Sequence, residues 1–424
     1  MRNFPPLRVQ GAVWCGERGM LPYFRMDVGR RAAFLSVARR FGTPVYVYDA
    51  GRIQVQAEAL KQHLPFASFF YAMKANSNPA ILRLVRQLGL GVETMSRGEI
   101  RLARSLGFSK ERISFTASSI SEDELRFAAR YAGRVHLDSL HQLELWGRLR
   151  LGEEISLRLN QGFGAGRHQH VITGGPGSKF GITLADLPRA RQLAARYKLR
   201  VVSLQQHIGS NILDAGIILR AARSLFAAAR DFPEVHFLDF GGGFGVPYKP
   251  EEQPLDLVRF GEGFAVLRDR FARREGREVA CAFEPGRFLV AQAGTLLVRV
   301  TDIKQTERHL FVGVDSGFNH LIRPAMYGSY HHIDNLSRTR GPRVRATVVG
   351  NICESGDIFA KDRELVRPRI GDVLAVRDAG AYGFAMASFY NMRPLPREIL
   401  MTPNGTVQDI SFSPARFLMK TKGR

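Results

Sequence analysis

A strand–helix–strand unit at residues 67–95 decides the fold, and it reads ASFFYAMKANSNPAILRLVRQLGLGVETM. The apolar run Ala67–Met73 is followed by an amphipathic stretch, Asn78–Leu88, and then by a second apolar run, Gly91–Met95. Short runs rich in Val, Leu and Phe are typical of strands that are buried on both faces of a parallel sheet. The unit therefore predicts two parallel strands joined by a helix.

The same alternation of apolar runs and helical patterns continues from about residue 43 to residue 290, which favours an α/β fold. Eight runs fit a closed TIM (β/α)8 barrel better than an open sheet, and no GxGxxG motif follows the first strand to favour a dinucleotide fold. A further run, Pro44–Tyr48, precedes them. The eight runs are Ala67–Met73, Gly91–Met95, Ile113–Thr116, Val135–Asp138, Ile155–Asn160, Val201–His207, Val235–Phe240 and Val279–Glu284. The clearest helical patterns are Asn78–Leu88, Arg97–Leu106, Glu122–Ala132 and Ala215–Ala229.

The rhythm changes after about residue 290, where strand patterns follow one another with few helices between them. They indicate a second, mainly β domain of sandwich or barrel type. We expect the barrel to span residues 43–288, and the β domain to comprise residues 1–42 and 289–424. The predicted strands of the β domain are Leu289–Ile303, His309–Val314, Arg343–Val349 and Asp372–Val376.

The composition is that of a globular protein with a strongly basic surface. The chain has 424 residues, of which 45% are hydrophobic, and 61 basic residues against 39 acidic ones give a formal charge of +22. These values exclude a disordered chain, a collagen and a small disulfide scaffold. Ten of the basic residues are Lys and 51 are Arg. The arginines are scattered and form no run, so the charge alone does not predict nucleic-acid binding.

The remaining sequence-wide features predict a reduced, cytoplasmic protein. Cys15, Cys281 and Cys353 lack the spacing of a metal site and are odd in number, so no disulfide framework is expected. The N-terminus has no apolar core of signal-peptide length, and no stretch approaches 18 uninterrupted apolar residues. We therefore expect no membrane association.

Two strand ends carry residues that suit a cofactor with an aldehyde and a flat ring. Chemistry in a TIM barrel sits at the carboxyl ends of the strands. Lys74 closes the first strand, where its amine could attack an aldehyde, although it could also simply reach solvent. His207 closes the sixth strand and is followed by Gly209 and Ser210. This imidazole could stack on a ring, but it could equally be a buried structural histidine.

The last two strand ends suit a phosphate and a ring nitrogen. Asp239–Gly245 contains four glycines, whose backbone N–H groups can approach a phosphate closely, unless the segment is only a flexible loop. Glu284 closes the eighth strand, where its carboxylate could pair with a protonated ring nitrogen. Gly286 and Arg287 follow it and could bind anions. An amine, a stacking group, a phosphate cradle and a carboxylate together predict a pyridoxal 5'-phosphate site.

In this order, Tyr71–Asn76, His207–Ser210, Asp239–Gly245 and Glu284–Arg287 resemble the fold-type III pyridoxal-phosphate decarboxylases. The resemblance runs from Gly42–Asp49 to Tyr390-Asn391 and implies a homodimer with active sites shared between subunits. Within this family, three C-terminal motifs resemble the diaminopimelate decarboxylases. They are Asp315–Tyr327, Cys353–Asp357 and Gly380–Gly383.

The resemblance implies decarboxylation of meso-2,6-diaminopimelate to L-lysine and CO2, the last step of lysine biosynthesis. It implies that Lys74 binds the cofactor covalently, that Glu284 keeps the ring nitrogen protonated and that His207 stacks on the ring. Cys353 would donate a proton across the subunit boundary, unless it is an inert buried cysteine. The phosphate would be held by Ser210, Gly242, Gly243, Gly286 and Tyr382, and the substrate by Arg287, Arg323, Tyr327, Glu354 and Tyr382.

The chain departs from the usual family pattern at Gln205, Gln161 and Asn351, where the family often has His, Pro and Pro. These departures concern groups around the site and remove no proposed catalytic side chain. The nearest alternative is a decarboxylase of ornithine, arginine, lysine or a carboxylated polyamine. An amino-acid racemase and a basic nucleic-acid-binding protein are further alternatives, although no recognition motif supports the last.

Overall fold

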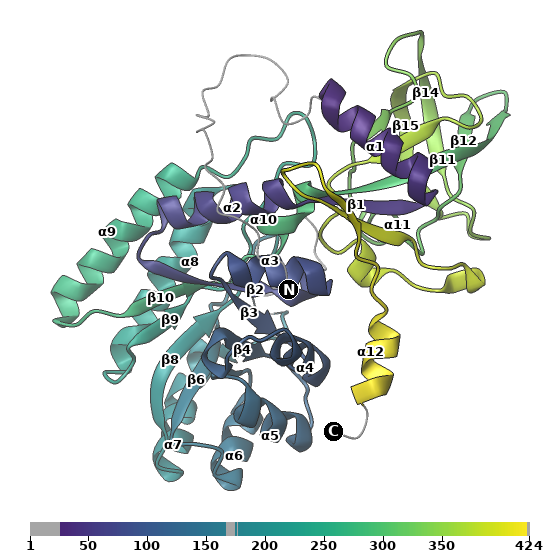
Figure 1. The fold of residues 1–424 in the computed structure, drawn as a ribbon. Helices are drawn as coiled ribbons and strands as arrows, with labels where there is room; N and C mark the ends of the chain where they lie inside the picture. Colours follow the sequence, from purple (N-terminus) through teal and green to yellow (C-terminus); the bar gives the residue numbers. More distant parts are fainter. Residues whose placement is uncertain (1–25, 167–173, 176, 422–424) are drawn as a thin grey trace.

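The computed structural model describes residues 26–166, 174–175 and 177–421 and contains a barrel and a second sheet (Figure 1). Eight parallel strands form a closed ring, because β10 pairs with β2 as well as with β9. All eight predicted strands are confirmed, with ends that agree within two residues. They are β2 (Ala67–Ala72), β3 (Gly91–Thr94), β4 (Ile113–Thr116), β5 (Arg134–Leu137), β6 (Glu154–Asn160), β8 (Arg200–Gln206), β9 (Phe237–Asp239) and β10 (Ala280–Phe283), and a short strand, β7 (Ile182–Thr183), pairs beside β6.

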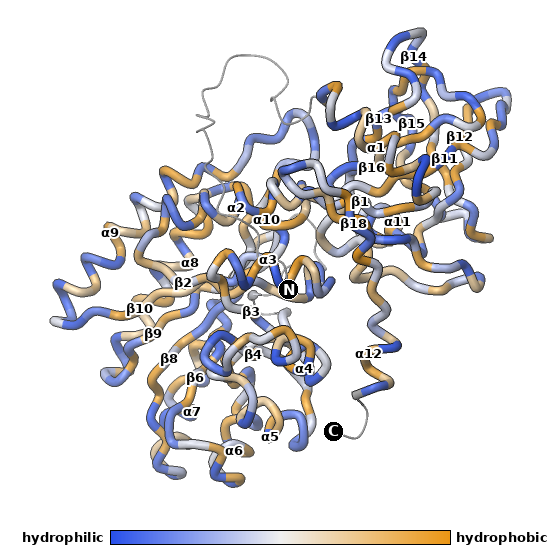
Figure 2. The backbone as a smooth tube through the Cα atoms, in the orientation of Figure 1, coloured by the Kyte–Doolittle hydropathy of each residue, from blue (hydrophilic) through white to orange (hydrophobic). Residues whose placement is uncertain are grey.

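Helices surround the barrel, with polar positions outward and apolar positions toward the strands (Figure 2). The four predicted helices are confirmed as α3, α4, α5 and α8. Asn78 explains the start of α3, because its side chain accepts the N–H of Ala80 at the helix N-terminus. The helices of the barrel are α2 (Ala50–His63), α3 (Pro79–Gln87), α4 (Arg97–Ser105), α5 (Glu122–Tyr131), α6 (Leu140–Leu149), α7 (Leu187–Arg196), α8 (Ala215–Ala228), α9 (Leu257–Glu275) and α10 (Arg287–Val290).

Aromatic packing fixes the helices α8 and α9 on the strands β9 and β10. The rings of Phe240 and Phe264 meet edge to face with centroids 4.7 Å apart. Phe226 and Phe283 extend this cluster, at 5.1 Å from Phe240 and Phe264 respectively. Such pairs add about 0.5–1.5 kcal/mol each beyond the burial of their area. They hold the two strands whose ends carry the glycine loop and Glu284.

The second sheet has nine strands and confirms the predicted β domain. The long strand β11 (Gly294–Gln305) pairs with β1 and β16 along its first half and with β12 along its second. It begins five residues after the predicted start because α10 occupies Arg287–Val290. The other strands are β1 (Val45–Asp49), β12 (Leu310–Val314), β13 (Ile333–Asn335), β14 (Arg343–Val349), β15 (Ile358–Val366), β16 (Val373–Val376), β17 (Arg397–Met401) and β18 (Val407–Asp409).

The domain boundary predicted at residue 43 assigns one strand, β1, to the wrong sheet. β1 pairs antiparallel with β11 and parallel with β17, so it lies in the second sheet and not in the barrel. Its residues are buried, as barrel strands are, and the apolar pattern alone could not separate the two cases. The helix α1 (Val28–Phe41) packs on the same sheet through Phe34 and Val37 (Figure 1). Residues 1–25 lie outside the described residues.

The two domains meet beside the end of β2. Glu398 on β17 accepts hydrogen bonds from Tyr48 Oη on β1 and from Asn78 Nδ2 at the start of α3, each at 2.9 Å. The N–H of Tyr382 donates to the carbonyl of Ala75 at 2.8 Å. These contacts place the segment after β16 over the carboxyl end of the barrel. Helices α11 (Arg323–Tyr327) and α12 (Pro414–Thr421) complete the domain. Within residues 26–166, 174–175 and 177–421, no helix is both long and apolar enough to cross a membrane.

Candidate active site

Lys74 lies where the sequence predicts it, in a single helical turn (Met73–Ala75) directly after β2. Its Nζ is 2.6 Å from Oε2 of Glu93. Burial lowers the pKa of Lys74, but the negative charge of Glu93 and the nearby Tyr382 and Glu284 outweigh this and raise it. The side chain keeps 33% exposure. It therefore reaches the mouth of the barrel as a paired ammonium, accessible to a ligand.

Glu93 is a site residue that the sequence reasoning missed. It is the last residue but one of the next strand, β3, and its side chain is only 1% exposed. A carboxylate in such a position needs a partner, and Lys74 provides it. The signal was present, because Glu93 is a charged residue inside the short apolar run Gly91–Met95. The rule that singled out Lys74 would have found it.

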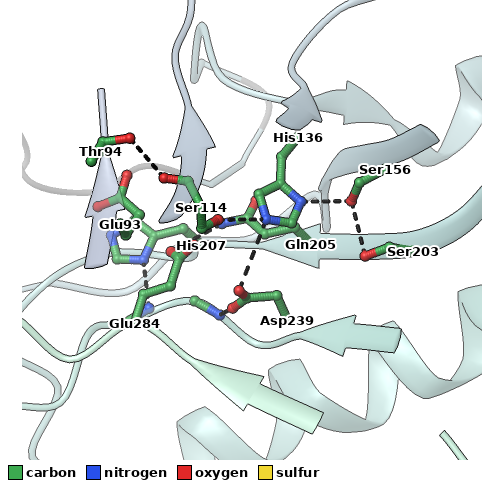
Figure 3. Close-up of polar contacts among 12 residues, drawn as sticks. Glu93, Thr94, Ser114, His136, Ser156, Ser203, Gln205, His207, Asp239 and Glu284 are labelled. Carbon is green, nitrogen blue, oxygen red and sulfur yellow. Dashed lines mark hydrogen bonds and ion pairs between the residues drawn. The ribbon is translucent and has the colours of Figure 1, made fainter. Parts of the chain in front are cut away.

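Glu284 directly follows β10 and is buried, and one of its oxygens has a protein donor (Figure 3). Gln205 Nε2 donates to Glu284 Oε2 at 3.1 Å. No donor among the described residues reaches Oε1, although this atom is buried. Burial, reinforced by the charges of Asp239 and Glu93, raises the pKa of Glu284. A buried acceptor without a donor fits the protonated ring nitrogen of pyridoxal phosphate.

His207 and the glycine loop lie beside Glu284. The N–H of Gly242 donates to His207 Nδ1 at 3.2 Å. Burial lowers the pKa of His207, and the positive charges of Lys74 and Arg158 lower it further, so the imidazole is neutral and suited to stacking on a ring. A Cβ atom on Gly242 would lie 2.3 Å from the Glu284 carbonyl oxygen. The close approach explains the glycine, and the loop is packed tightly against its neighbours.

Ser210, Arg287 and Tyr382 form a polar group next to the loop. Arg287 Nη2 donates to Ser210 Oγ at 2.8 Å, and Nη1 donates to Tyr248 Oη at 2.8 Å. The guanidinium also lies 4.9 Å from the ring centroid of Tyr382. Gly286, directly before Arg287, lies against Ala72 and Ala75, which flank Lys74. The structure thus brings the predicted phosphate-binding residues together at the end of the barrel.

Arg323 begins α11 and approaches the same group from the β domain. Its Nη1 is 3.1 Å from His331 Nε2, and its Nη2 donates to Ser329 Oγ at 3.3 Å. Its Cζ lies 4.7 Å from the centroid of Tyr248, while Cζ of Arg287 lies 5.8 Å from that ring. Sequence reasoning missed Tyr248 and His331, because neither belongs to a recognisable motif.

The charges of the two arginines are not compensated by the protein. Arg287 is 8% exposed and Arg323 is 5% exposed, and no carboxylate forms an ion pair with either within the described part of the chain. Burying a cation without a counter-charge is costly, so the pair is suited to receive an anionic group. Tyr327, predicted to contact substrate, is half-buried and contributes to the electrostatic field at Arg287.

Cys353 and Glu354 are not part of this cluster in the single chain. Both are exposed, on a loop whose base is held by Asp357, which accepts the N–H groups of Ile352 and Phe318. Asn391 Nδ2 lies 3.3 Å from Cys353 Sγ, and Tyr390 Oη donates to Glu354 Oε1 at 2.7 Å.

Among the described residues, no hydrogen bond joins Cys353 or Glu354 to the residues around Lys74. The exposure of Cys353 excludes the alternative of an inert buried cysteine. Phe389 and Met392 flank the partners of these two residues and are 58% and 92% exposed. An edge with apolar side chains and an exposed thiol thus faces outward from the β domain.

Comparison with known proteins places this geometry in context. Residues 50–291 match the family model described as "Pyridoxal-dependent decarboxylase, pyridoxal binding domain". The diaminopimelate decarboxylase of Methanothermobacter thermautotrophicus is 43% identical over 87% of this chain and 88% of its own. That of Escherichia coli K12 is 39% identical over 86% and 90%. The crystal structure of the Helicobacter pylori enzyme complexed with L-lysine superposes with a TM-score of 0.82, at 30% identity over 92% of this chain and all of that one.

Proposed function

The chain belongs to the diaminopimelate decarboxylase family of pyridoxal-dependent decarboxylases, and we propose that it converts meso-2,6-diaminopimelate to L-lysine and CO2. The observation that carries this choice of substrate is the pair Arg287 and Arg323. Two buried guanidinium groups, which form no ion pair with an acid among the described residues, lie beside the Lys74 site, where a second substrate carboxylate would neutralise them.

The residues present fit pyridoxal 5'-phosphate, which supplies an electron sink when it is bound. Lys74 offers the amine that holds its aldehyde carbon, and Glu284 Oε1 offers the free acceptor for its ring nitrogen. His207 offers a neutral ring for stacking. We assign the phosphate to Ser210, Gly242, Gly243, Gly286 and Tyr382.

Protons in the site are controlled by three buried groups. Gln205 donates to Glu284 Oε2 and so favours the ionised form of this acid, which keeps the proton on a ring nitrogen at Oε1. Glu93 Oε2 accepts a hydrogen bond from Lys74 Nζ and so fixes the position of the protonated amine. His207, which is neutral, adds no positive charge beside the ring.

Substrate binding follows from charge. Arg323 and Arg287 face the distal carboxylate, with Tyr327 and Tyr382 nearby. Glu354 is assigned to the distal ammonium. A thiol suits the proton donor, because its pKa can be tuned toward neutrality, and we assign that role to Cys353.

We further propose a homodimer whose active sites are shared. Cys353 and Glu354 are exposed together with Tyr390, Phe389 and Met392, and a second copy of the chain would cover this edge while bringing the thiol to its own Lys74. The assignment to the cytoplasm belongs to the same proposal, since an exposed catalytic thiol stays reduced there.

The product assay tests the function. The protein, supplied with pyridoxal phosphate, is expected to form L-lysine and CO2 from meso-diaminopimelate, while ornithine, arginine and lysine give far less product. Lys74→Ala serves as the control for the cofactor. Absence of lysine from this assay would refute the assignment. Amine products from ornithine, arginine, lysine or a carboxylated polyamine would favour the alternative decarboxylases, which share the scaffold but need no clamp for a distal carboxylate.

A further inference from the structure

His331 lies directly behind Arg323 and is completely buried. It precedes β13, which pairs antiparallel with β16, and this pairing brings its ring to the backbone at the end of β16. His331 Nδ1 is 2.8 Å from the carbonyl oxygen of Arg377. A carbonyl oxygen only accepts hydrogen bonds, so Nδ1 carries the proton.

The second ring nitrogen must then accept. His331 Nε2 is 3.1 Å from Arg323 Nη1, and a guanidinium only donates. The two contacts together require the neutral imidazole with its proton on Nδ1. Burial lowers the pKa of His331, and the surrounding guanidiniums of Arg323, Arg287 and Arg363 lower it further, which agrees with this geometry. Tyr248 closes the remaining side, with its ring 5.6 Å from the imidazole.

A neutral acceptor has a different effect from a carboxylate at the same place. A carboxylate would orient Arg323 and also cancel its charge. His331 and Ser329 orient two of its nitrogens and leave the charge intact. Because Arg287 is likewise held by the neutral groups Ser210 and Tyr248, two positive charges around one tyrosine ring have no acidic partner in the part of the chain that the structure describes.

We propose that His331 is a positioning residue that sets substrate specificity: as a neutral acceptor it aims Arg323 at the substrate while reserving the full guanidinium charge for a carboxylate. The inference rests on the proposed function, because it concerns how this site selects a substrate with a distal carboxylate. It adds that the selection depends on the neutral partners His331 and Ser329, which hold Arg323 where an acid would cancel its charge.

The test compares two ligands that differ by one carboxylate. L-Lysine and 1,5-diaminopentane share the same carbon chain and terminal amines, but only lysine has the carboxylate. Their dissociation constants are measured by calorimetry on the enzyme loaded with pyridoxal phosphate. The readout is the ratio of the two constants. In His331→Glu we expect the preference for lysine to fall about 30-fold or more, because the new carboxylate pairs with Arg323.

Two further variants separate charge from shape. His331→Gln retains a neutral acceptor and is expected to keep the ratio within about threefold, whereas His331→Leu loses the acceptor and should lower it about tenfold. The matched control is His332→Glu, which places the same charge one residue along, where the native ring faces Asp334 at 3.2 Å. Its ratio should stay at the wild-type value. For diaminopimelate, His331→Glu should raise KM far more than it lowers kcat.

An unchanged ratio in folded His331→Glu would overturn the inference, and so would equal loss of affinity for both ligands. If that variant does not fold, His331→Leu decides, with a wild-type ratio as the contrary result. The proposed function fails separately, when the wild-type enzyme forms no lysine from diaminopimelate. The ligand ratios remain measurable in that case, so the two failures are distinguishable.

Discussion

The residues around Lys74 and the loop that carries Cys353 are organised in opposite ways. Lys74, Glu93 and Glu284 lie at the ends of barrel strands, where each has a hydrogen-bonding partner within the chain. Cys353 and Glu354 lie on an exposed loop, and the described hydrogen bonds of their side chains go to the segment that contains Tyr390 and Asn391. The residues around Lys74 are therefore preorganised by contacts within the chain, whereas Cys353 and Glu354 are exposed at the surface.

This difference assigns separate tasks to the two regions. The rigid strand ends can hold a cofactor in a fixed orientation, because their backbone is determined by the barrel. The loop gains its function only when it faces a second surface. A homodimer of a barrel variant or of a loop variant should therefore have no intact site, while the two kinds of variant should complement each other in a heterodimer.

The largest effect is expected from Lys74→Ala. The variant loses the amine that holds the cofactor, so its visible absorbance should disappear after gel filtration and its activity should fall below detection. Lys179→Ala, which removes another lysine of the barrel, is the control and should retain the colour. A coloured and active Lys74→Ala protein would show that the barrel end is not the cofactor site.

Cys353→Ala should be the next most damaging change. Loss of a proton donor costs about 10²–10⁴-fold in kcat, whereas the absorbance of the cofactor should be unchanged. Cys281→Ala is the control, because the Cys281 thiol is buried in the core and burial raises its pKa to about 12.

Mixing the two inactive proteins sharpens the comparison between the regions. Random exchange of Lys74→Ala and Cys353→Ala subunits gives heterodimers in about half of the population, each with one intact shared site, so about a quarter of wild-type activity should return. Verified heterodimers without activity would contradict shared sites.

Gln205→Leu should have a smaller effect, confined to the barrel end. The hydrogen bond from Gln205 favours the charged form of Glu284, and a bond of this kind contributes about 1.5–3 kcal/mol, so kcat should fall about tenfold. Glu284 must be ionised for the reaction, so the activity of the enzyme is lost as the pH falls through the pKa of Glu284. Loss of the donor raises that pKa further, and the acidic limb of the kcat profile should move to higher pH.

The adjacent Gln206→Leu provides a matched control, since Gln206 is equally buried and the described hydrogen bond to Glu284 comes from Gln205. An equal shift of the acidic limb in both variants would indicate a general change in burial. A shift in Gln205→Leu alone would identify the amide as the group that keeps Glu284 charged.

The same contrast explains how far the sequence could predict the site. Lys74, Glu284 and the glycine loop follow from one rule, the strand end, because the apolar pattern locates every barrel strand within two residues. His331 and Tyr248 come close to Arg323 only through the pairing of β13 with β16 and the packing of the two domains. Such contacts join residues far apart in the chain, and no local pattern records them. For the same reason, β1 could not be separated from the barrel strands.

The smallest predicted effect concerns the joint between the two regions, at Glu398. Burial raises the pKa of Glu398 to about 7, although Asn78 and Tyr48 donate to it. Between pH 4.5 and 7 the folded state therefore binds more protons here than the unfolded state, and the free energy of unfolding falls as the pH rises, by about 3 kcal/mol in total. Glu398→Gln should remove this contribution, so its Tm should decline less than that of the wild type between pH 5 and pH 8.

Other buried acids do not obscure this comparison. Burial also raises the pKa values of Glu99 and Asp239 to about 7, but both groups are present in wild type and variant, and their contributions cancel in the difference. Glu364→Gln on the exposed part of β15 is the matched control and should leave the pH dependence of Tm unchanged. If Glu398→Gln follows the wild-type curve, the acid is already ionised without cost at the joint. The barrel and the β domain would then be held together equally well across this pH range.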